Sequence, residues 1–195
     1  MNKTKIFIAS ALTAMAAACS CPEKNELNLI PYPLSVEQGN GRFNAAGTSV
    51  TCCGIEDPMI ISSIKDFAGR LSEISGKETA LKVEEEVLME NTGGFNFIMD
   101  SSLGKEEYTL EIAKKGVTAK ASSLNGFLYA VQTIKQLLPV NIYGTLPAPD
   151  ADWNLPCLNI KDSPRFGYRG LHLDISRHFF DEKEVKRIID IMSIY

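Results

Sequence analysis

The chain has 195 residues, a formal net charge of −4 at pH 7 and an isoelectric point near 5.3. This acidic balance argues against a nucleic-acid partner, because a nucleic-acid surface needs clustered basic residues to displace counterions from phosphates. Hydrophobic residues make up 45% of the chain. That content is sufficient for one core of ordinary size, so a globular class is favoured over disorder.

The first 18 residues have the pattern of an export signal. Lys3 and Lys5 flank the start of the apolar run IFIASALTAMAAA, which is too short to span a bilayer and ends directly before Cys19. The Ala-Ala-Ala-Cys junction is similar to that of bacterial lipoprotein signals, which implies that Cys19 is lipidated and that residues 19–26 are a tether. We expect an exported protein, in the periplasm or at the outer membrane or cell surface, that meets the membrane only through this lipid anchor. A buried apolar helix is the alternative.

Four further cysteines follow Cys19, namely Cys21, Cys52, Cys53 and Cys157. Their even number is compatible with disulfides in an oxidising compartment, but a bridge between two adjacent cysteines would strain the backbone. No C-x-x-C or His-rich spacing indicates zinc. We expect packing residues that are free or variably paired, which leaves the disulfide status open, and we expect no metal and no organic cofactor.

Residues 27–150 have the pattern of a compact α+β domain. Short extended segments are predicted on both sides of a Gly-Asn-Gly turn at 39–41, over residues 95–100, and on both sides of a Lys-Lys-Gly turn at 114–116. Antiparallel pairing is the expected outcome of such turns. The sequence therefore predicts a small antiparallel sheet.

Two helices are predicted to cover one face of this sheet. Both have apolar residues at three-and-four spacing and a residue positioned to end the helix, Gly76 in the first and Pro139 in the second. The apolar stripes consist of Ile60, Ile64, Phe67, Leu71 and Ile74 in the first helix, and of Phe127, Val131, Ile134 and Leu138 in the second.

Proline becomes frequent after this domain. Five of the nine prolines lie within residues 139–164, a density that favours an extended connection over regular structure. We therefore expect a domain boundary near residue 150 and a linker over residues 151–165.

The last 30 residues, 166–195, carry a new pattern. In LHLDIS, residues 171–176, apolar and polar side chains alternate as in a strand. Asp181 and Glu184 then have the spacing of a capping box, and an apolar stripe at helical spacing follows them. A strand followed closely by a helix is the first unit of an α/β architecture.

In such architectures, side chains just past the carboxyl end of a strand form the ligand site. Arg177 and His178 occupy that position. A guanidinium presents several donors in a fixed fork, which suits two neighbouring sugar hydroxyls or a carboxylate. The alternative is an internal ion pair from Arg177 to Asp174 or Asp181.

The segment DSPRFGYRGLHLDISRHFFDEKEVKRIIDIMSIY resembles the entry to the catalytic barrel of glycoside hydrolase family 20, the β-N-acetylhexosaminidases. NLIPYPLSVEQGNGRF and YTLEIAKKGVTAKASSLNGFLYAVQTIKQLLP resemble the non-catalytic α/β domain that precedes the barrel. The resemblance implies that residues 27–150 are this domain and that residues 166–195 begin a (β/α)8 TIM barrel that is truncated here.

What the resemblance implies is hydrolysis of terminal, non-reducing N-acetylglucosamine or N-acetylgalactosamine from β-linked glycans, with retention and with the substrate's own acetamido group as nucleophile. Arg177 matches the arginine that binds hydroxyls of the terminal sugar, and Asp174 and His178 are candidates to support it. The resemblance places the catalytic glutamic acid and the orienting aspartate after the fourth barrel strand, beyond this chain. No residue of the chain is therefore assigned a catalytic role.

A complete barrel takes about 250 residues, so the resemblance implies an N-terminal portion of an enzyme that is inactive alone. The alternative is a non-catalytic exported α/β module with an interaction or carbohydrate-associated role. Coding DNA that continues in frame past Tyr195 would favour the enzyme. The choice between gluco and galacto sugars, the linkage, the aglycone and the oligomeric state stay open.

Overall fold

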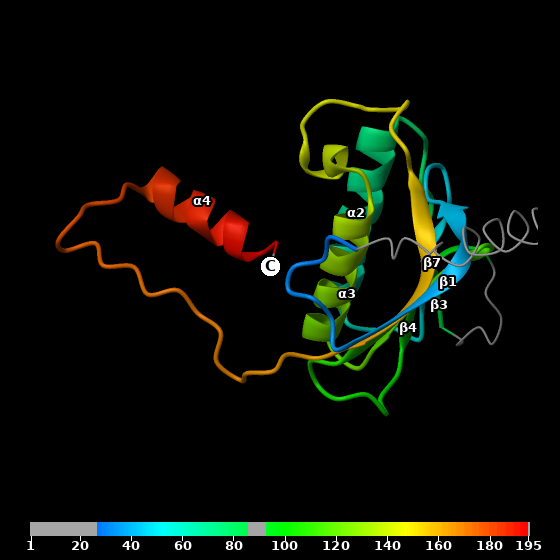
Figure 1. Ribbon diagram of the computed structural model, residues 1–195, viewed down its shortest axis with the longest axis horizontal. Coiled ribbons are helices and arrows are strands. Elements are labelled where there is room, and N and C mark those ends of the chain that lie inside the picture. The colour runs from blue at the N-terminus through cyan, green and yellow to red at the C-terminus, as the bar shows by residue number, and fades with distance from the viewer. Residues whose placement is uncertain (1–26, 86–92, 195) are drawn as a thin grey trace, which may run out of the picture.

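The structure is a computed structural model that describes residues 27–85 and 93–194 (Figure 1). The expected export signal, Cys19, the tether up to residue 26 and Cys21 lie outside the described residues. Among the helices that the structure describes, none is long and apolar enough to cross a membrane.

Seven strands form one mixed sheet in the order β1-β7-β5-β6-β4-β2-β3. The neighbouring strands β1–β7, β7–β5 and β5–β6 pair antiparallel. The neighbouring strands β6–β4, β4–β2 and β2–β3 pair parallel. The expected antiparallel sheet is therefore wrong for one half of the domain. The strands are β1 Ser35–Asn44, β2 Val50–Cys53, β3 Leu81–Glu84, β4 Gly94–Met99, β5 Tyr108–Ala113, β6 Gly116–Ala121 and β7 Asn154–Asp162.

Helical crossovers set the relative directions of two pairs of strands in this sheet. Helix α2, Pro58–Ser75, connects β2 to its parallel neighbour β3, and helix α3, Leu124–Leu137, connects β6 to β7 across β5. A helix between two strands brings the chain back to the same end of the sheet, so the strands on either side of it run in the same direction. The two helices thus set strand direction as well as covering the sheet.

Both helices lie on one face of the sheet, as predicted (Figure 1). Every residue of the two predicted apolar stripes is buried. Phe67 of α2 contacts Phe95 and Phe97 of β4 edge-on, with ring centroids 5.3 and 6.1 Å apart. The predicted end of α2 is confirmed, because Gly76 takes the left-handed conformation with φ of 67°.

The Gly-Asn-Gly stretch at 39–41 does not reverse the chain. It lies inside the single strand β1, which pairs with β7 on both sides of a register shift between Gln38 and Arg42. Gly41 has φ of 119°, a conformation that a bulge uses and that glycine reaches without strain. The predicted turn is therefore a β-bulge. By contrast, the predicted Lys-Lys-Gly turn does join the antiparallel strands β5 and β6.

Most of the expected linker at 151–165 is strand β7, which lies between β1 and β5. Proline lacks a backbone donor and is excluded from the middle of a ladder. Pro156 is tolerated here because β5 pairs only with residues 158–162, and Pro156 faces β1 beside the bulge. The domain thus continues to residue 162, beyond the expected boundary near 150.

After β7, residues 163–181 contain neither helix nor strand and lead to helix α4, Glu182–Met192 (Figure 1). The predicted capping box is confirmed, because Asp181 and Glu184 bond reciprocally at the start of α4. The strand expected over 171–176 is not formed. Strand geometry requires a hydrogen-bonded neighbour, and no described segment pairs with these residues.

Candidate functional site

Asp174 organises a tight turn at the position where the sequence predicted a strand. One carboxylate oxygen, Oδ1, accepts hydrogen bonds from the backbone amides of Ser176 and Arg177 at 2.9 and 3.2 Å. The other, Oδ2, accepts from Nε of Arg177 at 2.5 Å. The Arg177 side chain and the two amides hold the pKa of the Asp174 carboxyl below its usual range, because all three bonds favour the ionised form.

The internal ion pair that was the alternative for Arg177 is therefore present, with Asp174 as its partner. This ion pair uses only the Nε donor of the guanidinium. The Arg177 side chain is 87% exposed, and the bond through Nε leaves four of its five N–H donors on the two terminal nitrogens. The pair therefore orients a fork of donors that faces solvent.

His178, the other expected neighbour of this site, contacts Phe180 instead. The two rings meet edge-on with centroids 5.0 Å apart and an interplanar angle of 78°. The structure thus brings Asp174 to Arg177, while the ring of His178 packs against a residue close to the start of α4.

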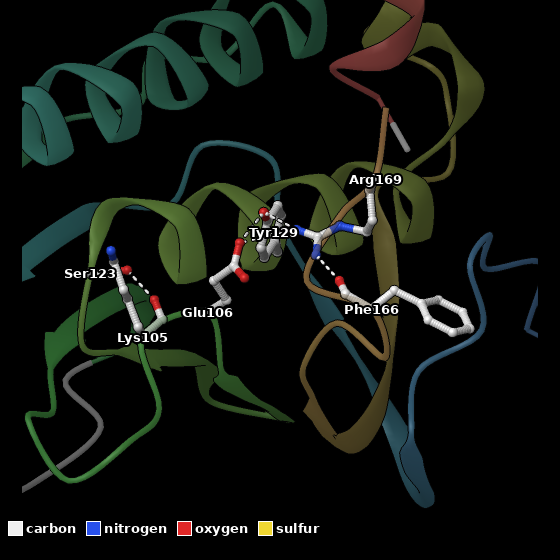
Figure 2. A network of polar contacts seen from close by, with 6 residues as sticks. All are labelled: Lys105, Glu106, Ser123, Tyr129, Phe166 and Arg169. Atoms are coloured by element: carbon white, nitrogen blue, oxygen red, sulfur yellow. Dashed lines mark hydrogen bonds and ion pairs between the residues drawn. The ribbon is translucent and has the colours of Figure 1, made fainter. Parts of the chain in front are cut away.

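A second polar cluster lies where the segment after β7 passes α3 (Figure 2). Arg169 Nη2 donates to Glu106 Oε1 at 3.0 Å and to the Tyr129 hydroxyl at 2.8 Å, and that hydroxyl donates to the same Glu106 oxygen at 3.0 Å. The Arg169 guanidinium lowers the pKa of Glu106, and the carboxylate in turn raises the pKa of Arg169. Burial raises the pKa of Tyr129.

Glu106 and Tyr129 were not predicted from the sequence as site residues. Glu106 lies in the loop between β4 and β5, Tyr129 lies on α3, and they are 63 and 40 residues from Arg169 in the sequence. No local spacing relates residues so far apart. The available signal was a tyrosine beside the apolar stripe of α3, which is too common to indicate a site.

A groove of about 610 Å³ adjoins this cluster. Its walls come from residues 29–34, from Tyr108 of β5, from α3, from residues 162–169 and from residues 192–194 at the end of α4 and just after it, and most of the lining side chains are apolar or aromatic. Gln132 also lines it, and Oε1 of Gln132 is buried without a hydrogen-bond partner in the described part of the chain. The groove therefore lies between the sheet domain and the segment that follows it.

Neither of these clusters resembles a metal site. The described residues contain no group of three or more His, Cys, Asp or Glu side chains that could hold a metal ion. Cys52 and Cys157 are buried free thiols, in agreement with the expected packing role. Burial, together with the neighbouring Cys53, raises the pKa of Cys52 to about 11, so its thiol stays protonated at neutral pH.

Comparison with known proteins divides the chain at the same place as the structure. Residues 26–163 match the model of glycosyl hydrolase family 20, domain 2, and residues 166–195 match that of the family 20 catalytic domain. A β-hexosaminidase of Porphyromonas gingivalis is 31% identical over 193 residues, which are 95% of this chain and 23% of that protein.

Two solved structures are also similar. A family 20 β-N-acetylhexosaminidase from Streptomyces coelicolor is 31% identical with a TM-score of 0.71, over 84% of this chain and 32% of that one. A mutant Streptomyces plicatus β-hexosaminidase in complex with the product GlcNAc is 29% identical with a TM-score of 0.68, over 86% of this chain and 32% of that one. This chain therefore spans a quarter to a third of the length of these relatives.

The first family match ends one residue after β7, so it covers the whole sheet with α2 and α3. The second begins at Phe166 and contains the Asp174–Arg177 turn and α4. The chain belongs to glycoside hydrolase family 20.

Proposed function

We propose that this chain is part of a β-N-acetylhexosaminidase that removes terminal non-reducing N-acetylhexosamine residues from β-linked glycans. The observation that carries the proposal is the catalytic-domain match over residues 166–195, within which Arg177 presents an exposed guanidinium. The related hexosaminidase solved with GlcNAc supports an N-acetylated sugar as the ligand.

Arg177 would bind the terminal sugar in this enzyme. Two adjacent hydroxyls of a pyranose can accept from the two terminal nitrogens of one guanidinium. Asp174 already holds Nε, so the fork has fewer orientations to lose when sugar binds. The geometry thus favours a preorganised binding group.

The chemistry in such an enzyme is substrate-assisted. The acetamido oxygen attacks the anomeric carbon while a glutamic acid protonates the leaving oxygen, and an aspartate orients the acetamide and stabilises its developing positive charge. The family resemblance places these two acids after the fourth barrel strand. We therefore assign neither role to an acid of residues 1–195.

Residues 166–195 would form the first β-α unit of the barrel, with α4 as its first helix. Leu171 and Ile175, on the apolar side of the expected strand, are 57% and 54% exposed. A neighbouring barrel strand would supply both the hydrogen bonds and the apolar cover that these residues lack in the described structure. Alternation in LHLDIS and the capping box of α4 support this assignment.

A chimera tests the proposed activity. Residues 27–195 would replace the matching segment of the Streptomyces coelicolor enzyme, and release of nitrophenol from an aryl N-acetylglucosaminide would be measured. We expect turnover by the chimera and none by purified residues 19–195. Turnover by the short chain that is lost on mutating one of its own residues would contradict the assignment. So would a chimera that folds with the native circular dichroism spectrum and yet leaves the substrate intact.

We also propose that the protein is exported and anchored through a lipid on Cys19, as the basic start, the apolar run and the alanine-cysteine junction indicate. Cells grown with a radiolabelled fatty acid should label the wild-type protein and leave Cys19→Ala unlabelled. Equal labelling of Cys19→Ala would exclude Cys19 as the anchor, and Cys21→Ala would then be the next variant.

A further inference from the structure

The cluster of Glu106, Tyr129 and Arg169 connects the two parts of the chain that match different family domains. Glu106 and Tyr129 belong to the first match, and Arg169 belongs to the second. Figure 2 shows the guanidinium of Arg169 reaching over α3 to both partners. The Asp174–Arg177 pair, by contrast, joins two residues that are three positions apart within the second match.

The contacts form a closed triangle rather than a single ion pair. Each of the three groups is hydrogen-bonded to the other two, at 2.8 to 3.0 Å. The guanidinium carbon of Arg169 also lies 5.7 Å from the centre of the Tyr129 ring, within range of a cation–π interaction. A second terminal nitrogen donates to the carbonyl oxygen of Phe166 at 2.6 Å, which fixes the guanidinium relative to its own backbone.

Glu106 and Tyr129 are held near each other by contacts that do not involve Arg169. Ser123, the N-cap of α3, donates from its hydroxyl to the carbonyl oxygen of Lys105, and Ser122 donates to that of Gly104 at 2.9 Å. Glu107 accepts from the backbone amide of Gly104 at 3.0 Å. The loop that carries Glu106 is therefore tied to the start of α3, and Tyr129 is on the same helix.

Partial burial separates this cluster from an ordinary surface pair. The side chains of Arg169 and Glu106 are 40% and 32% exposed, whereas those of Arg42 and Asp152, an ion pair inside the sheet domain, are 58% and 57% exposed. Fully exposed pairs contribute little because water and salt screen them. A partly shielded, three-membered network loses less to screening.

We propose that Glu106, Tyr129 and Arg169 form an interdomain latch that holds the first residues of the catalytic-domain segment against the sheet domain. Arg169 is then a positioning residue, which fixes the backbone eight residues before Arg177 and does not itself contact sugar. The latch does not depend on the proposed enzymatic activity, because all its members are present in residues 27–194.

NMR relaxation of the 195-residue chain tests the latch without any assay of activity. In the wild type, backbone order parameters of residues 167–170 should approach the value of about 0.85 typical of rigid backbone. In Glu106→Gln and in Arg169→Gln they should fall below about 0.6, while those of β4, β5 and β6 stay unchanged. The control is Arg42→Gln, which removes an ion pair inside the sheet domain and should leave residues 167–170 ordered.

The charge-exchanged double variant Glu106→Arg/Arg169→Glu should restore order in residues 167–170, as a direct contact requires. Failure of this rescue would overturn the proposal. So would residues 167–170 that are as mobile in the wild type as in the single variants. Loosening of β4–β6 together with the segment would also overturn it, because the three residues would then serve the sheet domain and not its connection to the next one.

Discussion

Nε of Arg177 donates to Oδ2 of Asp174 at 2.5 Å, within a turn whose backbone amides bond to the other carboxylate oxygen. This relationship makes the orientation of the candidate sugar-binding group a property of four consecutive residues. It therefore forms without the strand that the alternating pattern predicted.

The Asp174–Arg177 pair predicts a specific titration behaviour. Hydrogen bonds from Arg177 and two amides lower the pKa of Asp174 below its usual value of about 3.9. Arg177→Gln removes the charged donor but retains both amides, so the pKa of Asp174 should rise part of the way toward that value. The stabilisation that this carboxylate contributes is present above its unfolded pKa and is lost as pH falls through its folded pKa, so the variant should lose it at a higher pH.

Carboxyl carbon shifts measured by NMR as a function of pH report this directly. Asp152 is the matched control, because its pKa is also lowered but through Asn154 and Arg42. Its titration should be the same in both proteins. An Asp174 midpoint that does not move in Arg177→Gln would show that the ion pair is absent in solution.

Gly126 should not tolerate a methyl group, although it lies inside a helix. A Cβ at this position would be 2.7 Å from the carbonyl oxygen of Glu107 and 2.8 Å from Cβ of Ala121, so α3 would have to move away from the sheet. We expect Gly126→Ala to lower the free energy of unfolding by about 1–3 kcal/mol, as overpacking does.

Gly69 provides the control for Gly126. It is an exposed residue of α2, and in the described part of the chain no atom beyond its own helix backbone and chain neighbours lies within 4 Å of the position that an added methyl group would take. Gly69→Ala should therefore raise the free energy of unfolding by about 0.5–1 kcal/mol, the usual advantage of alanine in a helix. Urea unfolding measures both variants, and equal changes of the same sign would contradict the close approach at Gly126.

The hydroxyl groups of Tyr108 in β5 and Thr133 in α3 lie 2.7 Å apart and are buried. Tyr108→Phe leaves the Thr133 hydroxyl without this partner, at an expected cost of about 1–2 kcal/mol in the free energy of unfolding. Thr133→Val in the same protein should cost less than it does in the wild type, because the bond is already lost. Strictly additive effects in a urea-unfolding cycle would show that the two hydroxyls do not interact.

Elements defined by local spacing could be predicted from the sequence. The stripe from Ile60 to Ile74 specifies both the existence of α2 and its buried face, and Gly76 specifies its end. The direction of β2 relative to β3 could not be predicted in this way, because it depends on the crossover that α2 makes between the two strands. The prolines around Pro156 predicted a linker where β7 lies. Only the pairing of β7 shows that position 156 needs no backbone hydrogen-bond donor toward β5.

The residues of the candidate site also differ in whether local spacing or the tertiary fold brings them together. Asp174 and Arg177 are three residues apart and were identified together, whereas Glu106 and Tyr129 reach Arg169 only through the tertiary fold. Residues 171–176 alternate as a strand does, but alternation describes which side chains share a face and supplies no hydrogen-bonded neighbour.

Arg169 and Arg177 should respond differently to lysine in the chimera. Lysine keeps the charge and loses the fork in both cases. Arg169→Lys weakens the latch, so we expect the melting temperature of the chimera, which is more than twice as long as this chain, to fall by about 1 °C with little change in kcat/KM per folded molecule. A large loss of kcat/KM at an unchanged melting temperature would instead place Arg169 in the sugar site.

The most direct test of the proposed function is kcat/KM of the Arg177→Lys chimera on an aryl N-acetylglucosaminide. Hydrogen bonds that involve a charged group contribute roughly 1.5–3 kcal/mol each, and about 1.4 kcal/mol corresponds to a factor of ten in rate. We predict that kcat/KM falls by about ten- to a hundredfold or more while the melting temperature stays close to that of the parent chimera. An Arg177→Lys chimera that keeps the parent kcat/KM and melts at a much lower temperature would contradict the proposed sugar-binding role and make Arg177 a structural residue.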